Sequence, residues 1–168
     1  GGETFNAGLI QPDIFSNEDG IYRKDPQPTV GTRITGILST GIDECLILKD
    51  RGILLGRGVV NADGTLDFLI SVVSTEAGCA SFNQFARADD GWIYFNGYDD
   101  IYRYRQNEYQ PIIQHGQKND WLRTYLEVIT KAQKESFVIF YLPEGVIYFD
   151  GQADGLQFAF YAPRNLLD

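Results

Sequence analysis

Residues 45–55 read Cys-Leu-Ile-Leu-Lys-Asp-Arg-Gly-Ile-Leu-Leu, and this stretch contains the pattern that decides the fold. Apolar residues fill positions 45–48 and 53–55, and the residues between them are charged and end in a glycine. Short apolar runs separated by charged residues and glycine are typical of β-strands joined by tight turns. The stretch therefore predicts a β-hairpin, with one strand at 45–49 and the next at 52–57.

The same pattern, a charged residue followed by glycine and an apolar run rich in aromatics, occurs five times; the copies begin at Asp19, Arg51, Asp90, Asp99 and Glu144. In the copy at Asp99 an aspartate takes the place of glycine. The turn glycines at 20, 52, 91 and 145 are 32, 39 and 54 residues apart. A four-stranded propeller blade spans roughly 40–50 residues. We therefore predict an all-β fold of antiparallel, β-propeller-like blades, with two alternatives: a closed ring of about four small blades, or an incomplete ring that missing sequence or a neighbouring subunit completes.

The distribution of prolines and apolar runs divides the chain into two parts. Residues 1–30 contain three prolines and few apolar runs, so we expect an extended lead-in before a β-propeller-like domain at 31–168. One short helix is predicted near 119–126, where an Asn-Asp pair can cap its start. The predicted strands are 35–39, 45–49, 52–57, 68–73, 82–88, 92–96, 100–104, 127–132, 137–142 and 146–149. A helix that continues to Ala132 is the competing prediction for the strand at 127–132.

Alternation along these strands predicts the core. We expect it to contain Leu46, Leu48, Ile53, Leu55, Phe68, Ile70, Ile93, Phe95, Tyr102, Tyr104, Val138, Phe140, Ile147 and Phe149. Truncation of a buried phenylalanine such as Phe140 to alanine is then expected to cost about 3–5 kcal/mol.

Composition excludes several classes of function. The 168 residues carry a formal charge of −9, and an acidic surface repels phosphate groups, so tight nucleic-acid binding is disfavoured. No apolar stretch approaches the roughly 20 residues that cross a bilayer, so we expect no membrane span. The chain contains no methionine, from which we expect a piece of a longer or processed protein. Cys45 and Cys79, the only two cysteines, are expected to be buried free thiols, with a disulfide between them as the alternative.

Candidate catalytic and metal-binding residues are few. The single histidine, His115, lies in a polar loop, which argues against a catalytic triad or a histidine-rich metal site. The loop around Asp63 offers oxygen ligands, but a hairpin turn explains it without an ion. The acidic pairs at 43–44, 89–90 and 99–100 lie at strand starts, where solvated turns are expected. We therefore expect no catalytic, cofactor-binding or metal-binding residues, and we single out Trp92, Tyr98 and Tyr109 as loop aromatics available for surface contacts.

Several motifs, in the same order, resemble the β-propeller region of bacteriophage tail-nozzle proteins and of the packaged-DNA-stabilisation (head-completion) proteins of short-tailed phages. The resemblance rests on the hairpin at 45–55, on the segment 72–81 with its Gly78-Cys79-Ala80-Ser81 junction, on the strand pairs at 90–104 and 137–150, and on the isoleucine-rich segment 109–113 that leads into a short helix. It covers about two thirds of the chain. Members of that family are several times longer than this chain.

The resemblance implies a structural virion protein without catalytic activity or cofactors, assembled in the host cytoplasm and located in the phage tail. It also implies a homo-oligomeric ring that contacts portal or adaptor and tail-fibre proteins. DNA would then be cargo that passes through the ring, since a like-charged wall lets the duplex slide. Two other hypotheses stay open: a propeller-like module that binds a glycan or a protein partner, and a propeller-type hydrolase that uses paired carboxylates.

Overall fold

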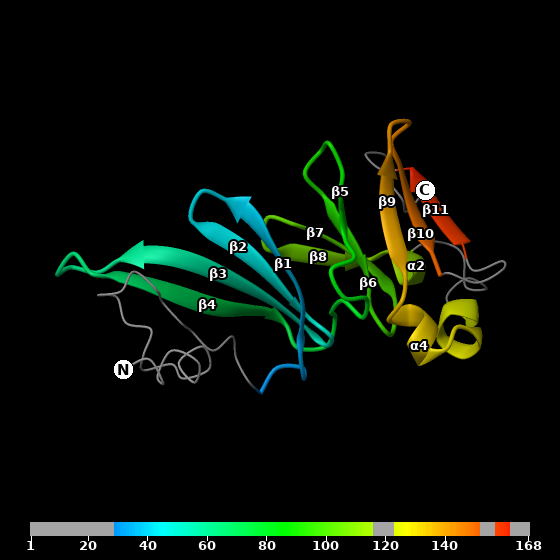
Figure 1. Ribbon diagram of the computed structural model, residues 1–168, viewed down its shortest axis with the longest axis horizontal. Helices are drawn as coiled ribbons and strands as arrows, with labels where there is room; N and C mark the ends of the chain where they lie inside the picture. The colour runs from blue at the N-terminus through cyan, green and yellow to red at the C-terminus, as the bar shows by residue number, and fades with distance from the viewer. Residues whose placement is uncertain (1–28, 116–122, 152–156, 162–168) are drawn as a thin grey trace, which may run out of the picture.

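The structure, a computed structural model, describes residues 29–115, 123–151 and 157–161, which form three antiparallel sheets in succession along the chain (Figure 1). In each sheet, every strand pairs with the next one in sequence. The N-terminal sheet contains β1 (Ile34–Gly41), β2 (Glu44–Lys49), β3 (Gly52–Val60) and β4 (Leu66–Ser74). The middle sheet contains β5 (Ala86–Arg87), β6 (Ile93–Asn96), β7 (Ile101–Arg105) and β8 (Glu108–Pro111). The C-terminal sheet contains β9 (Val138–Leu142), β10 (Val146–Asp150) and β11 (Gln157–Tyr161).

The predicted antiparallel all-β fold is confirmed at the level of these three sheets. The hairpin from which the prediction started is β2 and β3, in which Leu46 pairs with Leu55 and Leu48 with Ile53. Gly91 and Gly145 have φ of +91° and +83°, as the predicted tight turns require. Gly20 lies outside the described residues. The proposed division into a lead-in at 1–30 and a domain at 31–168 stays a prediction, because residues 1–28 also lie outside them.

Short helical segments link the middle and C-terminal sheets: α2 (Ile112–His115), the π-helix η3 (Thr124–Val128) and α4 (Lys131–Lys134). The predicted strand at 127–132 is therefore wrong. Thr130 and Gln133 form a capping box that starts α4, with Thr130 N donating to Gln133 Oε1 at 2.9 Å. A continuous helix to Ala132 is also wrong, since Ile129 is extended (φ −75°, ψ 120°). Of the helix predicted near 119–126, residues 119–122 lie outside the described part of the chain, and η3 covers only its end.

Two further differences concern strands. The C-terminal sheet takes its third strand from β11, which follows β10, instead of from a segment before β9. The strand predicted at 82–88 is reduced to Ala86–Arg87. Asn83 has a φ of +55°, which interrupts an extended backbone, and its N–H donates to Thr35 O at 2.6 Å.

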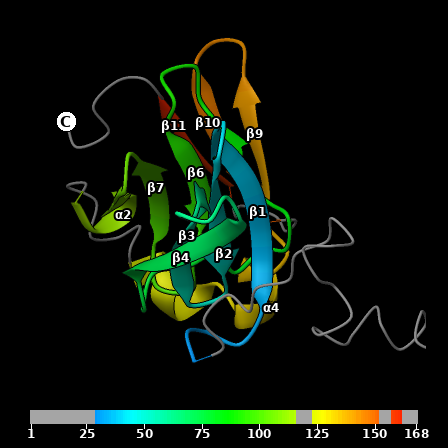
Figure 2. The ribbon, with the colours of Figure 1, turned by 90° about the vertical axis from the view of Figure 1, so that its left-hand side faces the viewer.

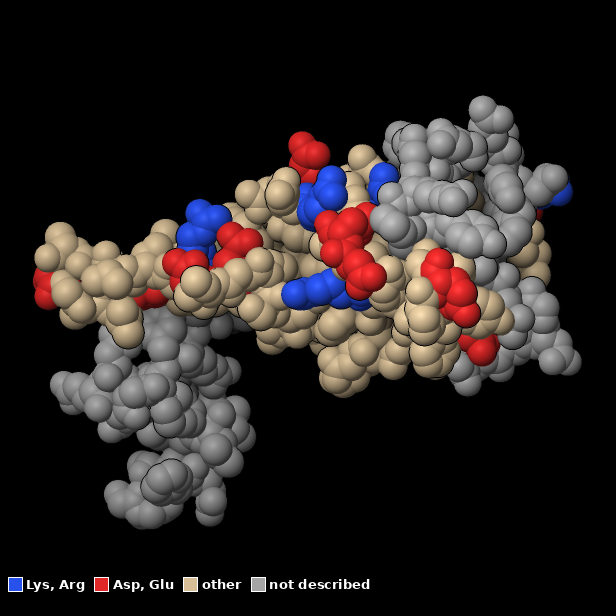
Figure 3. All heavy atoms as spheres, turned by 90° about the horizontal axis from the view of Figure 1, so that it is seen from above, with Lys and Arg blue, Asp and Glu red and all other residues tan. Residues whose placement is uncertain are grey.

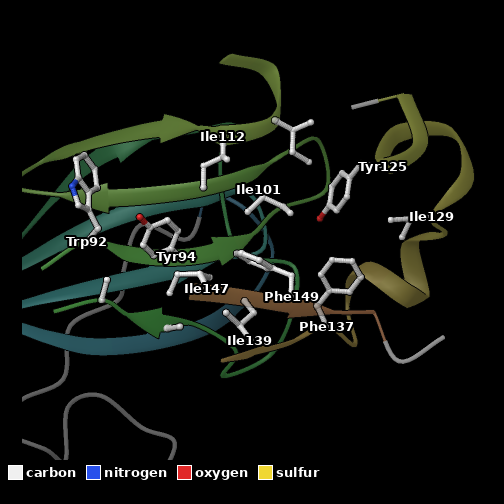
Figure 4. Close-up of a cluster of buried hydrophobic side chains, with 13 residues drawn as sticks. Trp92, Tyr94, Ile101, Ile112, Tyr125, Ile129, Phe137, Ile139, Ile147 and Phe149 are labelled. Atoms are coloured by element: carbon white, nitrogen blue, oxygen red, sulfur yellow. The ribbon is translucent and has the colours of Figure 1, made fainter. Parts of the chain in front are cut away.

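The middle sheet lies between the other two, so both of its faces are covered (Figure 1). Alternate residues of a strand point to opposite faces, and in β6 every side chain is buried. Ile93 and Phe95 pack on the N-terminal sheet with Leu46 and Ile53. On the other face, Tyr94 and Ile101 pack against Phe137, Ile147 and Phe149, as Figure 4 shows.

The first strand of each sheet lies on the same side of this stack. β5 contacts β9, and the segment before β5 is joined to β1 by the hydrogen bond from Asn83 to Thr35. Arg87 of β5 also donates to Ser39 O of β1. Figure 2 shows β1 and β9 on the same side of the molecule, away from β7. Each successive sheet therefore begins at one common edge and progresses away from it.

The predicted core is mostly confirmed, with one clear error. Phe140 is 47% exposed, while its neighbour Ile139 is buried. Residues 137–142 are all apolar, so alternation alone did not identify the inward-facing residues. Three other predicted core residues are only half-buried: Phe68, Ile70 and Val138.

Candidate interaction surfaces

Residues 78–81, which we call the sheet junction, lie where the chain leaves the N-terminal sheet for the middle sheet. Cys79 N donates to Lys49 O at the end of β2, at 2.8 Å. Ala80 N donates to Asn96 O at the end of β6, at 2.7 Å. The junction thus joins the ends of two consecutive sheets through backbone hydrogen bonds.

The last residue of the junction, Ser81, connects it to the third sheet. Its hydroxyl donates to Lys134 O at 2.6 Å and accepts from Phe137 N at 3.1 Å, just before β9. Asn96 Nδ2 donates to the same Lys134 carbonyl at 2.7 Å and lies 3.3 Å from the Tyr125 hydroxyl. These side chains are buried, and buried polar groups that find partners hold the surrounding segments in one arrangement.

Gly78 has a specific steric reason to be glycine. A Cβ at this position would lie 2.6 Å from Asp50 O and 2.7 Å from Gly52 N, both backbone atoms. Gly52, by contrast, does not adopt the positive φ that its predicted turn required. Instead, a Cβ there would meet Val30 at 2.6 Å. Both glycines are therefore required by close packing around the turn between β2 and β3.

The N-terminal outer face is the side of β1–β4 that points away from the middle sheet. One row across its four strands consists of Ile37, Ile47, Leu54 and Val72. Val30 packs on Ile47 and Leu54, which are buried. Ile37 and Val72 are 58% and 43% exposed. This face is therefore apolar and only partly covered within the described residues.

The C-terminal outer face is the side of β9 and β10 that points away from the middle sheet. Val138, Phe140 and Leu142 of β9 share it with the residues opposite them on β10, which are Asp150, Tyr148 and Val146 in that order. Phe140 and Leu142 are exposed, and the other four residues, Asp150 among them, are half-buried. Within the described residues, the stack of three sheets thus has a largely apolar outer face on each side.

The far ends of β3 and β4 form an arm that projects beyond β1 and β2, on the left of Figure 1. Its last pair is Val60 with Leu66, and both side chains are exposed. In the loop that closes it, Asp63 Oδ1 accepts from Thr65 N at 3.0 Å, and the hydroxyl of Thr65 also donates to it. This is the turn expected for that loop.

The three aromatics predicted to be available for surface contacts are not brought together. Trp92 is only 8% exposed, so its predicted availability is wrong. The guanidinium groups of Arg103 and Arg105 lie over its ring, 4.1 and 4.4 Å from the centroid. Tyr98 lies beyond the opposite end of β6 from Trp92. Tyr109 of β8 is exposed, and its ring packs edge-on against Tyr102 at 6.0 Å.

Tyr98 lines a pocket of about 550 Å³ between the turn of β2 and β3 and the helical segments. The guanidinium of Arg51 lies 4.8 Å from the ring centroid of Tyr98, and the Tyr98 hydroxyl donates to Glu135 at 3.2 Å. Arg51 also pairs with Asp99 at 3.2 Å, and Lys134 Nζ donates to Tyr98 O at 2.6 Å. The charged groups of this pocket therefore already have partners on the chain.

Two acidic residues in the described part of the chain, Asp50 and Asp100, are buried and accept structural hydrogen bonds. Burial disfavours the ionised form of Asp50, but hydrogen bonds from Thr32, Arg33 and Arg51 hold its pKa below the ordinary value. A glycosidase acid requires the opposite shift. Asp100 is buried, which contradicts its predicted solvated turn, and burial raises its pKa although backbone N–H groups donate to it. Asp100 has a structural role, because its carboxylate accepts hydrogen bonds from backbone N–H groups in the first turn of α2.

Metal and thiol chemistry find little support in the described part of the chain. It contains no group of three or more histidine, cysteine or acidic residues that could hold a metal ion. The side chain of His115 lies outside the described residues. Both cysteines are free thiols, as expected, although Cys45 is half-buried instead of buried. Burial raises the pKa of Cys79 to about 12, so its thiolate is scarce at neutral pH.

Charges of both signs are interleaved on the face seen from above in Figure 3. The described residues on this face show no broad basic patch. Arg57, for example, pairs with Glu44 at 2.7 Å. Such a surface gives little of the counterion release on which DNA binding depends. In the described ranges, no helix is both long and apolar enough to cross a bilayer.

Comparison of the chain with known protein families and with curated proteins finds no match.

Proposed function

We propose that this chain is a structural protein made of β-propeller-like blades that builds a ring together with neighbouring subunits. One observation carries the proposal: three successive meander sheets stack face to face and leave an apolar face at each end. Repeats that bury their faces only on one another need a cap or a neighbour at each end. A ring removes both unpaired ends.

The arrangement of strands supports blades over a two-layered sandwich. A sandwich buries one face of each of two sheets, whereas here the middle sheet is buried on both faces and the stack continues to a third. In this proposal, β1, β5 and β9 at the common edge would be the inner strands of the blades, which face the central axis. The residues of the sheet junction lie between consecutive sheets, where the resemblance places a blade junction.

Within this class, we propose a phage tail or head-to-tail connector protein, located in the virion and bound to portal or adaptor and tail-fibre proteins. The charge of −9 and the mixed charges in Figure 3 suit a channel wall that lets DNA pass without holding it. The proposal includes no catalytic activity; the two buried carboxylates described above, Asp50 and Asp100, accept structural hydrogen bonds. The propeller-like module that binds a glycan has less support, because Arg103 and Arg105 already cover the ring of Trp92.

Sedimentation and negative-stain electron microscopy of the full chain test this proposal. We expect closed ring-shaped particles with a central channel. Duplex DNA mixed with them should not be retained at about 150 mM salt, since the protein offers few phosphate contacts. A strictly monomeric protein, or tight and salt-dependent retention of DNA, would contradict the proposal.

A further inference from the structure

Both outer faces have the composition of faces that are packed inside the molecule. An antiparallel sheet with one face in water normally carries polar residues on that face. On the N-terminal outer face, the exposed Ile37 and Val72 lie in one row, and the only charged residue that alternation places there, Lys49, is buried. On the C-terminal outer face, Phe140 and Leu142 are exposed. Among the described residues neither face carries an exposed charge, and the one acidic residue on the C-terminal outer face, Asp150, is half-buried.

The internal packing of the chain shows what kind of surface such a face accepts. The middle sheet receives an apolar sheet face on each side, through Phe95 on one and Tyr94 on the other. The N-terminal and C-terminal sheets each pack one face on the middle sheet. Each outer face is the opposite side of one of these two sheets. A further sheet laid on either would continue the same packing.

We propose that the C-terminal outer face of one copy of this chain docks on the N-terminal outer face of a second copy. This inference rests on the proposed function and names the contact by which the ring is built. Every copy carries both faces, so in a closed ring each outer face is covered by the other face of a neighbouring copy. Because the two faces differ, the contact is head-to-tail, and such contacts close into rings when the rotation between copies permits.

Two single substitutions separate this contact from its alternatives. Ile37→Asp places a charge on the N-terminal outer face, and Phe140→Asp places one on the C-terminal outer face. Each alone should weaken self-association at least about tenfold, because a carboxylate would be buried without a partner. Mixed in equal amounts, the two variants should form heterodimers, since each still carries one intact face, and these should not grow further.

A matched control comes from the same sheet. Leu69 is exposed on β4 but on the side opposite to Ile37, so Leu69→Asp should leave association unchanged. Far-UV circular dichroism and thermal unfolding should show that all three variants are folded, because all three positions are exposed. The association of each variant is measured by sedimentation velocity over a range of concentrations.

The two cysteines give a second readout that needs no substitution. Cys45 lies half-buried on the N-terminal outer face, next to the row of Ile37. Its alkylation by N-ethylmaleimide should slow at least about threefold as the wild-type chain associates, because docking would cover it. Cys79 is fully buried in the junction and should react only on unfolding, which makes it the internal control.

The outcomes separate this inference from the proposed function. Ring particles that persist in both Asp variants would overturn the head-to-tail contact while leaving a ring-forming protein. Loss of association in only one variant would indicate a symmetric contact and would also overturn it. A wild-type chain that stays monomeric, with Cys45 equally reactive at all concentrations, would overturn both.

Discussion

Strands β6 and β9 have similar apolar sequences but different surroundings. All four residues of β6 are buried, whereas in β9 Ile139 is buried and Phe140 is exposed. The difference comes from position in the stack, since β6 has a sheet on each side and β9 has one only on its inner side. An apolar run therefore predicts a strand, but it does not tell how many of its faces the same chain covers.

The largest expected effect compares a phenylalanine in each strand. Phe95→Ala should lower the free energy of unfolding by about 3–5 kcal/mol, because it opens a cavity between two packed sheets. Phe140→Ala should cost less than about 1 kcal/mol in the isolated chain, because about half of the residue is already exposed to water. Urea unfolding followed by fluorescence measures both values.

Equal losses in the two variants would remove the distinction between a covered and an uncovered face. If Phe140→Ala is costly only at protein concentrations where the chain associates, the comparison is sharpened instead. The outer face would then be buried by association, and the loss would fall on dilution.

The next effect concerns two glycines with different surroundings. Gly78→Ala should destabilise the fold by about 2–3 kcal/mol, since the new methyl group would overlap with the backbone of Asp50 and Gly52. Gly58 is the control, because a Cβ there would lie 3.8 Å from Asp43, an ordinary contact. Gly58→Ala should therefore be neutral or slightly stabilising in the same unfolding experiment. Similar costs at both positions would show that the sheet junction is not tightly packed.

The smallest effect concerns Asp50, which follows the last residue of β2 in the N-terminal sheet. Asp50→Asn should cost about 1 kcal/mol at pH 7, because the carboxylate accepts hydrogen bonds from Thr32, Arg33 and Arg51. The pKa of Asp50 is lowered in the folded protein, so its stabilisation is present above its ordinary pKa of 3.8 and is lost as the pH falls below that value. The free energies of unfolding of the wild type and of the variant should therefore converge as the pH falls below about 4. A difference that stays constant over this range would show that the charge of Asp50 has no part in it.

Much of the local fold could be predicted because turn chemistry is local. Gly91 and Gly145 need left-handed backbone whatever surrounds them, and the strands that they join were found. The strand at 127–132 failed because the capping box of Thr130 and Gln133 and the extended Ile129 compete with an apolar pattern that suits either structure. The third strand of the last sheet failed because its pairing partner lies after β10.

The candidate surfaces were harder to predict. Trp92 was expected to be available for contacts, but two arginines fold over it from β7, and their positions depend on the register of that strand with β6. Phe140 was expected inside, yet a run in which every residue is apolar gives alternation nothing to select. Nothing in the sequence indicated the exposed outer faces except such runs, which contain more apolar residues than one buried face of a strand needs.

The sequence by itself determined the turns, most strands and the antiparallel class, because these depend on backbone conformation and on neighbours a few residues away. Only the tertiary structure decided which apolar faces are covered, since burial depends on segments far apart in the chain. The hairpin at 45–55 shows both: Leu46 and Leu48 face the middle sheet, while Ile47 between them faces outward on the N-terminal outer face. Its pattern predicts two strands, and the position of the sheet in the stack determines that only one side is fully enclosed.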